Sequence, residues 1–325
     1  MSDSSIDRPA LPGEVDRFRT IFRRAHAAHP RCLADEWLME PCALEDGSPA
    51  PRPIVWSRRN GPWRRSEILW VGAAPGNAGE RGAGELGAHG TRIPFGGDIS
   101  GANLEALFGS IGLTRNETFI VAALNQLPAR GGGEPTVGEL AAPVGSCASS
   151  LHLLRDTIVA VGARLVVALG GVAVRATIAA AGLEAPRPAR GGEARVTLPT
   201  LARLQKAGIE RGRATAWPEH VAADEAFLDD WRRAWGDAPL PHILWLTHPS
   251  AQNMSPFARV ETAFHGRMVE ARDALRRAAR EVLGRTPPSH RPATPVTGIY
   301  ALPEWRERIA PRYERLDRLW REKGI

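Results

Sequence analysis

The stretch that decides the fold runs from Ile68 to Gly101, ILWVGAAPGNAGERGAGELGAHGTRIPFGGDISG. It begins with four large apolar residues, which predict a buried strand, and continues into a long glycine-rich loop. Gly72, Pro75 and Gly76 follow the strand and bring bare backbone to its carboxyl end. Open α/β proteins bind ligands at that edge of the sheet, so the loop is predicted to form one wall of an active site. A mobile surface loop is the alternative for this stretch taken alone.

The rest of the chain alternates between apolar runs of strand length and segments with helical spacing. The predicted strands lie at 118–124, 164–169 and 242–247, and the predicted helices lie at 103–111, within 139–161, at 172–181 and at 260–283. Strands that alternate with helices of this length imply a parallel sheet with right-handed crossovers. The predicted fold class is therefore α/β, with a central parallel-type sheet flanked by helices on both faces.

Composition divides the chain into three parts. Residues 1–65 are expected to be an N-terminal extension that packs on the core, with one helix near 15–28. Residues 66–284 are expected to form the α/β domain, with an insertion at about 182–241 that is rich in proline, arginine and glycine. Residues 285–325 are expected to be a C-terminal tail.

The totals favour a globular protein of the cytoplasm. The chain has 325 residues, of which 43% are apolar, enough for a sizeable core. The N-terminus lacks the pattern of a signal peptide, and the longest apolar region, 157–174, is interrupted by Arg164, so no membrane span is expected. The three cysteines, Cys32, Cys42 and Cys147, form no close pair, which fits a reducing compartment. We expect a monomer.

The positive charge is almost entirely arginine. The formal net charge is +6, and Lys206 and Lys323 are the only lysines. The guanidinium fork suits phosphate, so nucleic acid is a plausible partner, although a solvated basic surface is the alternative.

Three motifs at predicted strand ends carry a resemblance to a known family. They are Gly72-Ala73-Ala74-Pro75-Gly76, then Pro94-Phe95-Gly96-Gly97-Asp98-Ile99-Ser100-Gly101, then His248-Pro249-Ser250-Ala251-Gln252-Asn253. In this order they resemble the motifs of the uracil-DNA glycosylase superfamily, most closely its fourth and fifth families, over roughly 68–284 without the insertion. The resemblance implies a DNA repair enzyme of base excision that flips uracil out of DNA and removes it, leaving an abasic site. Other deaminated bases are the alternative substrates.

The resemblance also implies roles for individual residues. Phe95 would be the platform on which the flipped base stacks, and His248 would donate a hydrogen bond to the departing uracil. Gly72, Ala74, Pro75 and Gly76 would line the base pocket. Asn125 is the candidate reader of the uracil edge.

The loop after the last strand is expected to touch the DNA. Gln252, Asn253 and Met254 would push into the duplex and fill the space that the flipped base vacates. Ser250 would hold a phosphate.

The residue that activates water is not evident, because Ala73 and Ala74 stand where related families carry a polar side chain. Asp98 is the first candidate and Asn77 the second, and the alternative for Asp98 is a turn carboxylate that bonds nearby backbone N–H groups.

No cofactor is expected. The fourth and fifth families carry an iron–sulfur cluster, and Cys147 stands at about the place of one ligand. Gln126 stands where another would be, and Cys32 and Cys42 lack the usual close pairing, so the chain is one thiolate short of a set.

Two hypotheses from other classes stay open beside the glycosylase. The first is a non-catalytic protein that binds uracil-containing or abasic DNA with the same fold. The second is a small-molecule α/β enzyme whose glycine loop binds phosphate, although no GxGxxG or GKS/T pattern occurs.

Overall fold

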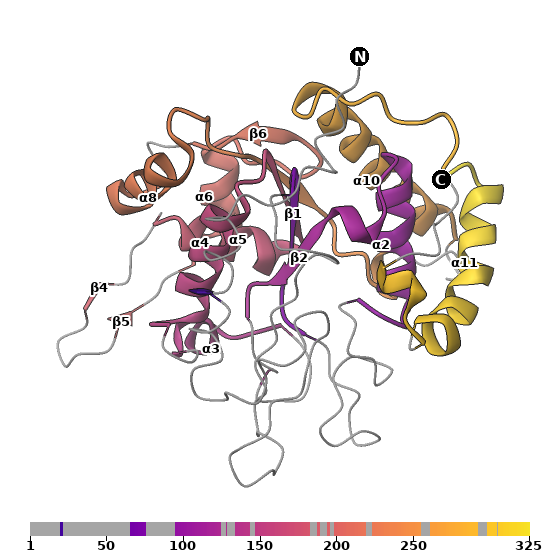
Figure 1. Ribbon diagram of the computed structural model, residues 1–325, viewed down its shortest axis with the longest axis horizontal. Helices are drawn as coiled ribbons and strands as arrows, with labels where there is room; N and C mark the ends of the chain where they lie inside the picture. The colour runs from indigo at the N-terminus through magenta and orange to yellow at the C-terminus, as the bar shows by residue number, and fades with distance from the viewer. Residues whose placement is uncertain are drawn as a thin grey trace, which may run out of the picture.

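The computed structural model describes most of the chain between Ser66 and Ile325. The described residues are 20–21, 66–75, 95–124, 128, 134–143, 147–182, 187–188, 194–195, 198–218, 223–254, 261–291, 298–303 and 305–325. They form a five-stranded sheet between two layers of helices (Figure 1). This arrangement confirms the predicted α/β class and its helices on both faces.

The sheet has the strand order β2-β1-β3-β7-β6. Its strands are β1 (Ile68–Gly72), β2 (Phe119–Ala122), β3 (Leu165–Leu169), β7 (His242–Leu246) and β6 (Ala214–Ala216). The first four run parallel, and β6 adds an antiparallel edge to β7. Because helices cover both faces, the residues of β1 and β3 are buried throughout, and this explains their continuous apolar runs.

One helical layer packs on the face to which Leu69 and Val71 of β1 point. It contains α3 (Val137–Ala141), α4 (Ser150–Val161), α5 (Gly171–Ala180), α6 (Leu201–Lys206) and α8 (Glu225–Trp235). α4 begins where the Ser149 hydroxyl accepts the His152 backbone N–H, and it ends at Gly162, whose φ of 56° is the left-handed conformation that glycine tolerates.

The second layer covers the face to which Ile68 and Trp70 of β1 point. It contains α2 (Ile99–Ser110), α9 (Ala251–Met254), α10 (Glu261–Glu281) and α11 (Ala310–Glu322), with the short helical turns η4 (Arg115–Glu117), η5 (Gly298–Ala301) and η6 (Trp305–Ile309). α2 begins before the predicted helix because Asp98 caps it.

The segment expected as an insertion contributes to both the sheet and a helical layer. β6 and α8 belong to it, and the side chains of Phe227 and Trp231 on α8 are buried in the core. It also contains a separate two-stranded sheet of β4 (Arg187–Pro188) and β5 (Ala194–Arg195).

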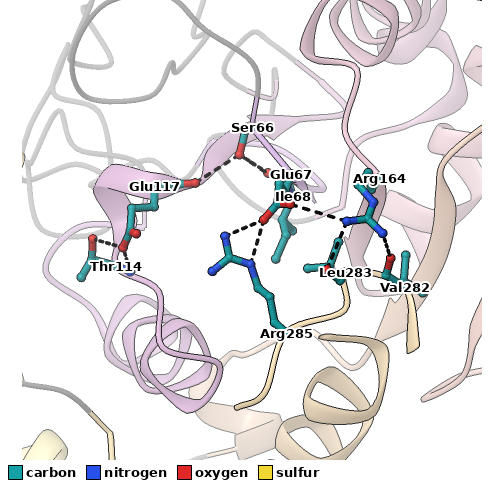
Figure 2. A network of polar contacts seen from close by, with 9 residues as sticks. All are labelled: Ser66, Glu67, Ile68, Thr114, Glu117, Arg164, Val282, Leu283 and Arg285. Carbon is teal, nitrogen blue, oxygen red and sulfur yellow. Dashed lines mark hydrogen bonds and ion pairs between the residues drawn. The ribbon is translucent and has the colours of Figure 1, made fainter. Parts of the chain in front are cut away.

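The amino edge of the sheet is closed by a polar network around Glu67 (Figure 2). Nε of Arg285 donates to Oε2 of Glu67 at 2.8 Å, and Nη1 of Arg164 lies 3.6 Å from Oε1. Arg164 also donates to the carbonyl of Leu283 at 3.1 Å, and the Ser66 hydroxyl donates to the carbonyl of Glu117 at 3.2 Å. The charges at this edge are used to join the start of β1 to the end of α10.

Candidate active site

The opposite, carboxyl edge of the sheet contains the switch point of the fold. From β1 the chain passes through α2 to β2 on one side, and the next strand, β3, lies on the other side of β1. Crossovers that leave in opposite directions open a crevice outside the strand ends, which is where α/β proteins bind ligands. The residues that follow β1, β3 and β7 at this edge are the candidates for function.

Phe95 and His248 meet at this edge. Their ring centroids are 6.2 Å apart, with the ring planes inclined by 39°. Both side chains are half-buried. The structure therefore brings together the predicted base platform and the predicted hydrogen-bond donor, which lie more than a hundred residues apart in the chain.

Two glycines make room for these rings. A Cβ added at Gly72 would lie 3.1 Å from Cζ of Phe95, and one added at Gly170 would lie 3.3 Å from Cβ of His248. Gly170 has a φ of 96° and donates its N–H to the carbonyl of Leu246 at 2.9 Å, which joins the ends of β3 and β7. Each glycine thus lies directly against one of the two rings, where a side chain would displace it.

The pKa of His248 lies below the ordinary value for histidine. Burial lowers this pKa, while the negative charges of Asp98 and Glu134 act in the opposite direction with smaller effect. The imidazole is therefore neutral at pH 7 and carries one N–H donor. Among the described residues, none hydrogen-bonds to its ring.

Asn253 braces the turn that carries His248. Its side-chain amide donates to the carbonyl of His248 at 3.1 Å and to the hydroxyl of Ser250 at 3.0 Å. The backbone of Gln252 lies in the short helix α9. The amide of Asn253 is thus engaged within the protein.

Met254 lies inside the protein and not on its surface. Its side chain is 0% exposed and belongs to the apolar cluster between the sheet and α10. The helical turn of α9, in which the Met254 N–H donates to the carbonyl of Ser250 at 2.9 Å, directs this side chain inward. This position differs from the expected exposed wedge and leaves Gln252 as the candidate for that role.

Asp98 is the N-cap of α2. Oδ1 accepts the backbone N–H of Gly101 at 2.8 Å. This is the turn-carboxylate role given as the alternative, and within the described part of the chain no donor reaches the other oxygen. The negative charge of Asp98 acts on His248 in the direction that raises the pKa of the imidazole.

Ala73 and Ala74 are partly buried against the apolar cluster on the α4 side of the sheet. The carbonyl of Ala73 accepts the N–H of Leu124 at 3.0 Å, so the pairing of β1 with β2 continues into the loop. Pro75 follows and is buried. Neither alanine can take a proton, and Ala73 is held by the sheet.

Three predicted site residues lie outside the described residues. They are Gly76, Asn77 and Asn125.

The cysteines do not fit an iron–sulfur cluster. Cys147 is 2% exposed and packs in the apolar cluster beside Leu151. Cys32 and Cys42 lie outside the described residues, and three cysteines cannot supply the four thiolates of such a cluster. No group of three or more metal-binding side chains occurs in the described part of the chain.

Sequence reasoning missed Gly170 as a part of this edge. The signal was available, because Gly170 follows a buried parallel strand as Gly72 does. A glycine at a second strand end indicates a second place where backbone approaches the crevice.

The fold and the edge define a class of protein. An aromatic ring beside a neutral imidazole at the switch point of an α/β sheet suits a planar ligand that accepts a hydrogen bond.

Comparison with family models identifies that class. The model described as the uracil DNA glycosylase superfamily matches residues 59–272, and the chain belongs to this superfamily. This confirms the superfamily predicted from the motifs and assigns the chain to the DNA glycosylases, which act on bases in DNA. A comparison with curated proteins found no significant match. None of the helices in the described residues is long and apolar enough to span a membrane.

Proposed function

We propose that this protein hydrolyses the N-glycosidic bond of uracil in DNA and leaves an abasic site, as a divergent relative of the fourth and fifth families. The single observation that carries the proposal is the pairing of Phe95 and His248 at the switch point, 6.2 Å between ring centroids. An enzyme that acts on a base must take it out of the stack and hold it against an aromatic or apolar surface. The ring of Phe95 serves as that surface.

His248 acts on the leaving group. When the bond between C1′ and N1 breaks, its electron pair passes to uracil, and negative charge develops on the ring oxygens. A neutral imidazole N–H directed at O2 stabilises that charge more strongly in the transition state than in the substrate. The lowered pKa of His248 supports this role, because the imidazole stays neutral at the pH of the cell.

The remaining site residues complete the proposal. Water adds its oxygen to C1′, and its proton passes to a nearby acceptor. The oxygen of Asp98 that does not cap α2 is the first candidate acceptor, and Asn77 is the second candidate for orienting the water. Asn125 reads the uracil edge, while Ser250 and Gln252 contact the DNA.

A non-catalytic DNA-binding protein is the second candidate. The observation that favours it is the apolar packing of Ala73 and Ala74, which leaves no polar group at the start of the loop. In that case Asp98 serves only as the cap of α2.

One assay separates the two candidates. A labelled duplex with a single uracil is incubated with the purified protein, and abasic sites are cleaved with alkali under single-turnover conditions. We expect His248→Ala to slow excision by about 100-fold, the usual effect of removing one such donor. His242→Ala is the matched control, because it removes a histidine from the amino end of β7, the strand whose carboxyl end leads to His248.

Each outcome of the assay has a defined meaning. Excision by the wild type that survives in His242→Ala and is lost in His248→Ala supports the proposal. Binding of the duplex without strand cleavage contradicts it and favours the non-catalytic candidate. Equal rates for the wild type and His248→Ala contradict the role of the histidine.

A further inference from the structure

The described residues 298–303 and 305–325, here called the C-terminal segment, lie beyond the part of the chain that the family model matches. They contain η5, η6 and α11 and pack against α2 (Figure 1). The segment therefore lies next to the helix that begins four residues after Phe95.

A cluster of three aromatic rings, those of Tyr300, Trp305 and Tyr313, holds the segment together. The ring centroids of Tyr300 and Trp305 are 4.8 Å apart at 89°, and those of Trp305 and Tyr313 are 5.5 Å apart at 85°. Both angles give the edge-to-face geometry that aromatic pairs favour. These side chains are buried together with Ala102 of α2.

Tyr313 holds the loop of the base platform. Its hydroxyl donates to the carbonyl of Phe95 at 2.6 Å and accepts the N–H of Gly97 at 2.9 Å. A Cβ added at Gly101 would lie 1.9 Å from this hydroxyl, so the glycine is what lets the tyrosine approach. Arg312 adds a bond from Nη1 to the carbonyl of Gly97 at 3.2 Å.

The residue held in this way has an unusual backbone. Phe95 has a φ of 52°, and it is the one non-glycine residue with positive φ in the described part of the chain. A bulky residue keeps this conformation only where its surroundings hold it, and such residues cluster at functional sites. Burial raises the pKa of Tyr313, so its hydroxyl remains protonated and able to donate.

Helix α11, which carries Tyr313, also contacts the turn that follows His248. Nε1 of Trp320 donates to Oδ1 of Asn103 at 2.8 Å. Nδ2 of Asn103 donates to the carbonyl of Pro249 at 2.9 Å and to that of Met254 at 3.3 Å. The side chains of Asn103 and Trp320 are 0% exposed, so this bridge between α11 and the turn after His248 is shielded from water.

We propose that the C-terminal segment is a clamp that sets the distance between the Phe95 ring and the His248 imidazole, with Tyr313 and Trp320 as positioning residues. The clamp rests on the proposed function, since it assigns both rings to one bound base. The two arms start from one rigid helix, so the walls cannot separate without breaking a buried hydrogen bond.

Tyr313→Phe tests the first arm with little change in volume. Without the hydroxyl, the N–H of Gly97 and the carbonyl of Phe95 each lose a hydrogen-bond partner. The cost of leaving such a buried group unpaired corresponds to a factor of about ten in an equilibrium constant. We expect hydrogen–deuterium exchange at Gly97 to quicken about tenfold and single-turnover uracil excision to slow about tenfold. Affinity for a duplex without uracil should change by less than about twofold, because that duplex supplies no base for the site.

Tyr300→Phe is the matched control. It removes a second buried tyrosine hydroxyl from the same aromatic cluster, and that hydroxyl bonds Glu105 and the N–H of Arg115. Among the described residues it has no direct bond to the Phe95 loop and is linked to it only through Arg115, whose Nη2 donates to the Phe95 carbonyl at a long 3.4 Å. We expect it to lower the thermal midpoint as Tyr313→Phe does while excision changes by less than about threefold.

Trp320→Phe tests the second arm and should slow excision while Gly97 exchange stays that of the wild type.

The readouts separate the clamp from the proposed function. If the wild type excises no uracil but Tyr313→Phe still quickens exchange at Gly97, the proposed function is wrong and the clamp on the loop stands. If exchange at Gly97 does not change in Tyr313→Phe, the clamp is wrong. Equal loss of excision in Tyr313→Phe and Tyr300→Phe also overturns it, because general destabilisation would explain both.

Discussion

The amino and carboxyl edges of the same sheet use their polar groups in different ways. At the amino edge, Glu67 bonds Arg285 and is approached by Arg164, and each arginine joins one element to another. At the carboxyl edge, one oxygen of Asp98 and the amide of Asn253 also bond within the protein, but the ring of His248 bonds no described residue. Polar groups that hydrogen-bond within the protein stabilise the fold, whereas polar groups without a partner in the protein can bind a ligand.

The largest effect is expected from Gly101→Ala at the carboxyl edge. The added Cβ would lie 1.8 Å from the carbonyl oxygen of Phe95, so the loop backbone must move. Displacement of a substrate-positioning group by about 1 Å costs about 100-fold in rate, and we expect that loss in single-turnover excision. Gly138→Ala is the control, since the nearest atom to its added Cβ is 4.0 Å away. Wild-type excision by Gly101→Ala would show that the Phe95 loop does not position the base.

Gly72→Ala should give a smaller effect. Its added Cβ would lie 3.1 Å from Cζ of Phe95, so the ring must shift by a few tenths of an ångström. We expect excision to slow about tenfold with an unchanged thermal midpoint. The control is Gly171→Ala at the same edge, where the nearest atom would be at an ordinary 3.8 Å. Equal rates for both variants would mean that the ring is free to move.

The pH dependence of the single-turnover excision rate should follow the protonation of His248. Its pKa is lowered, so the neutral form persists below pH 6.5, where an ordinary histidine gains its proton. We expect the single-turnover rate to stay constant as pH falls through 6.5 and then to fall about tenfold per pH unit below the lowered pKa. The unfolded chain binds this proton first, so the same group makes the free energy of unfolding decrease below pH 6.5. A rate that declines from pH 7 downward would contradict a buried, neutral imidazole.

The smallest effect on excision is expected at the amino edge. Arg285→Ala removes the partner of Glu67 and should lower the free energy of unfolding by about 1 kcal/mol, less at high salt. Excision should change by less than about twofold, measured beside chemical denaturation. Arg280→Ala, at an exposed position on α10, is the control. A loss of excision at constant stability would show that the two edges are coupled.

Much of the fold follows from local patterns in the sequence. Buried parallel strands are continuous apolar runs, so β1, β3 and β7 could be located from the local sequence alone. Because parallel strands end at one edge, the motifs after β1 and β7 predict that residues of these two segments meet there, and the family resemblance adds Phe95 and His248 as the meeting residues. The two rings do lie side by side at this edge.

Other parts of the site depend on contacts that no local pattern encodes. The inward direction of Met254 follows from the helical turn of α9, whereas the motif alone suggested an exposed loop. The spacing of Trp305, Ile309, Tyr313 and Trp320 indicates a helix with one buried face, but not which surface covers it. Tyr313 meets Phe95 over a separation of 218 residues, and only the folded chain brings them together.

At Phe95, whose backbone is left-handed, selection for stability and selection for function favour different residues. For a bulky side chain this conformation costs about 1 kcal/mol or more, and glycine would remove that cost. Glycine would also remove the ring that faces His248. Sequences selected in the laboratory for stability alone should therefore drift away from phenylalanine here, while those selected for excision should retain it.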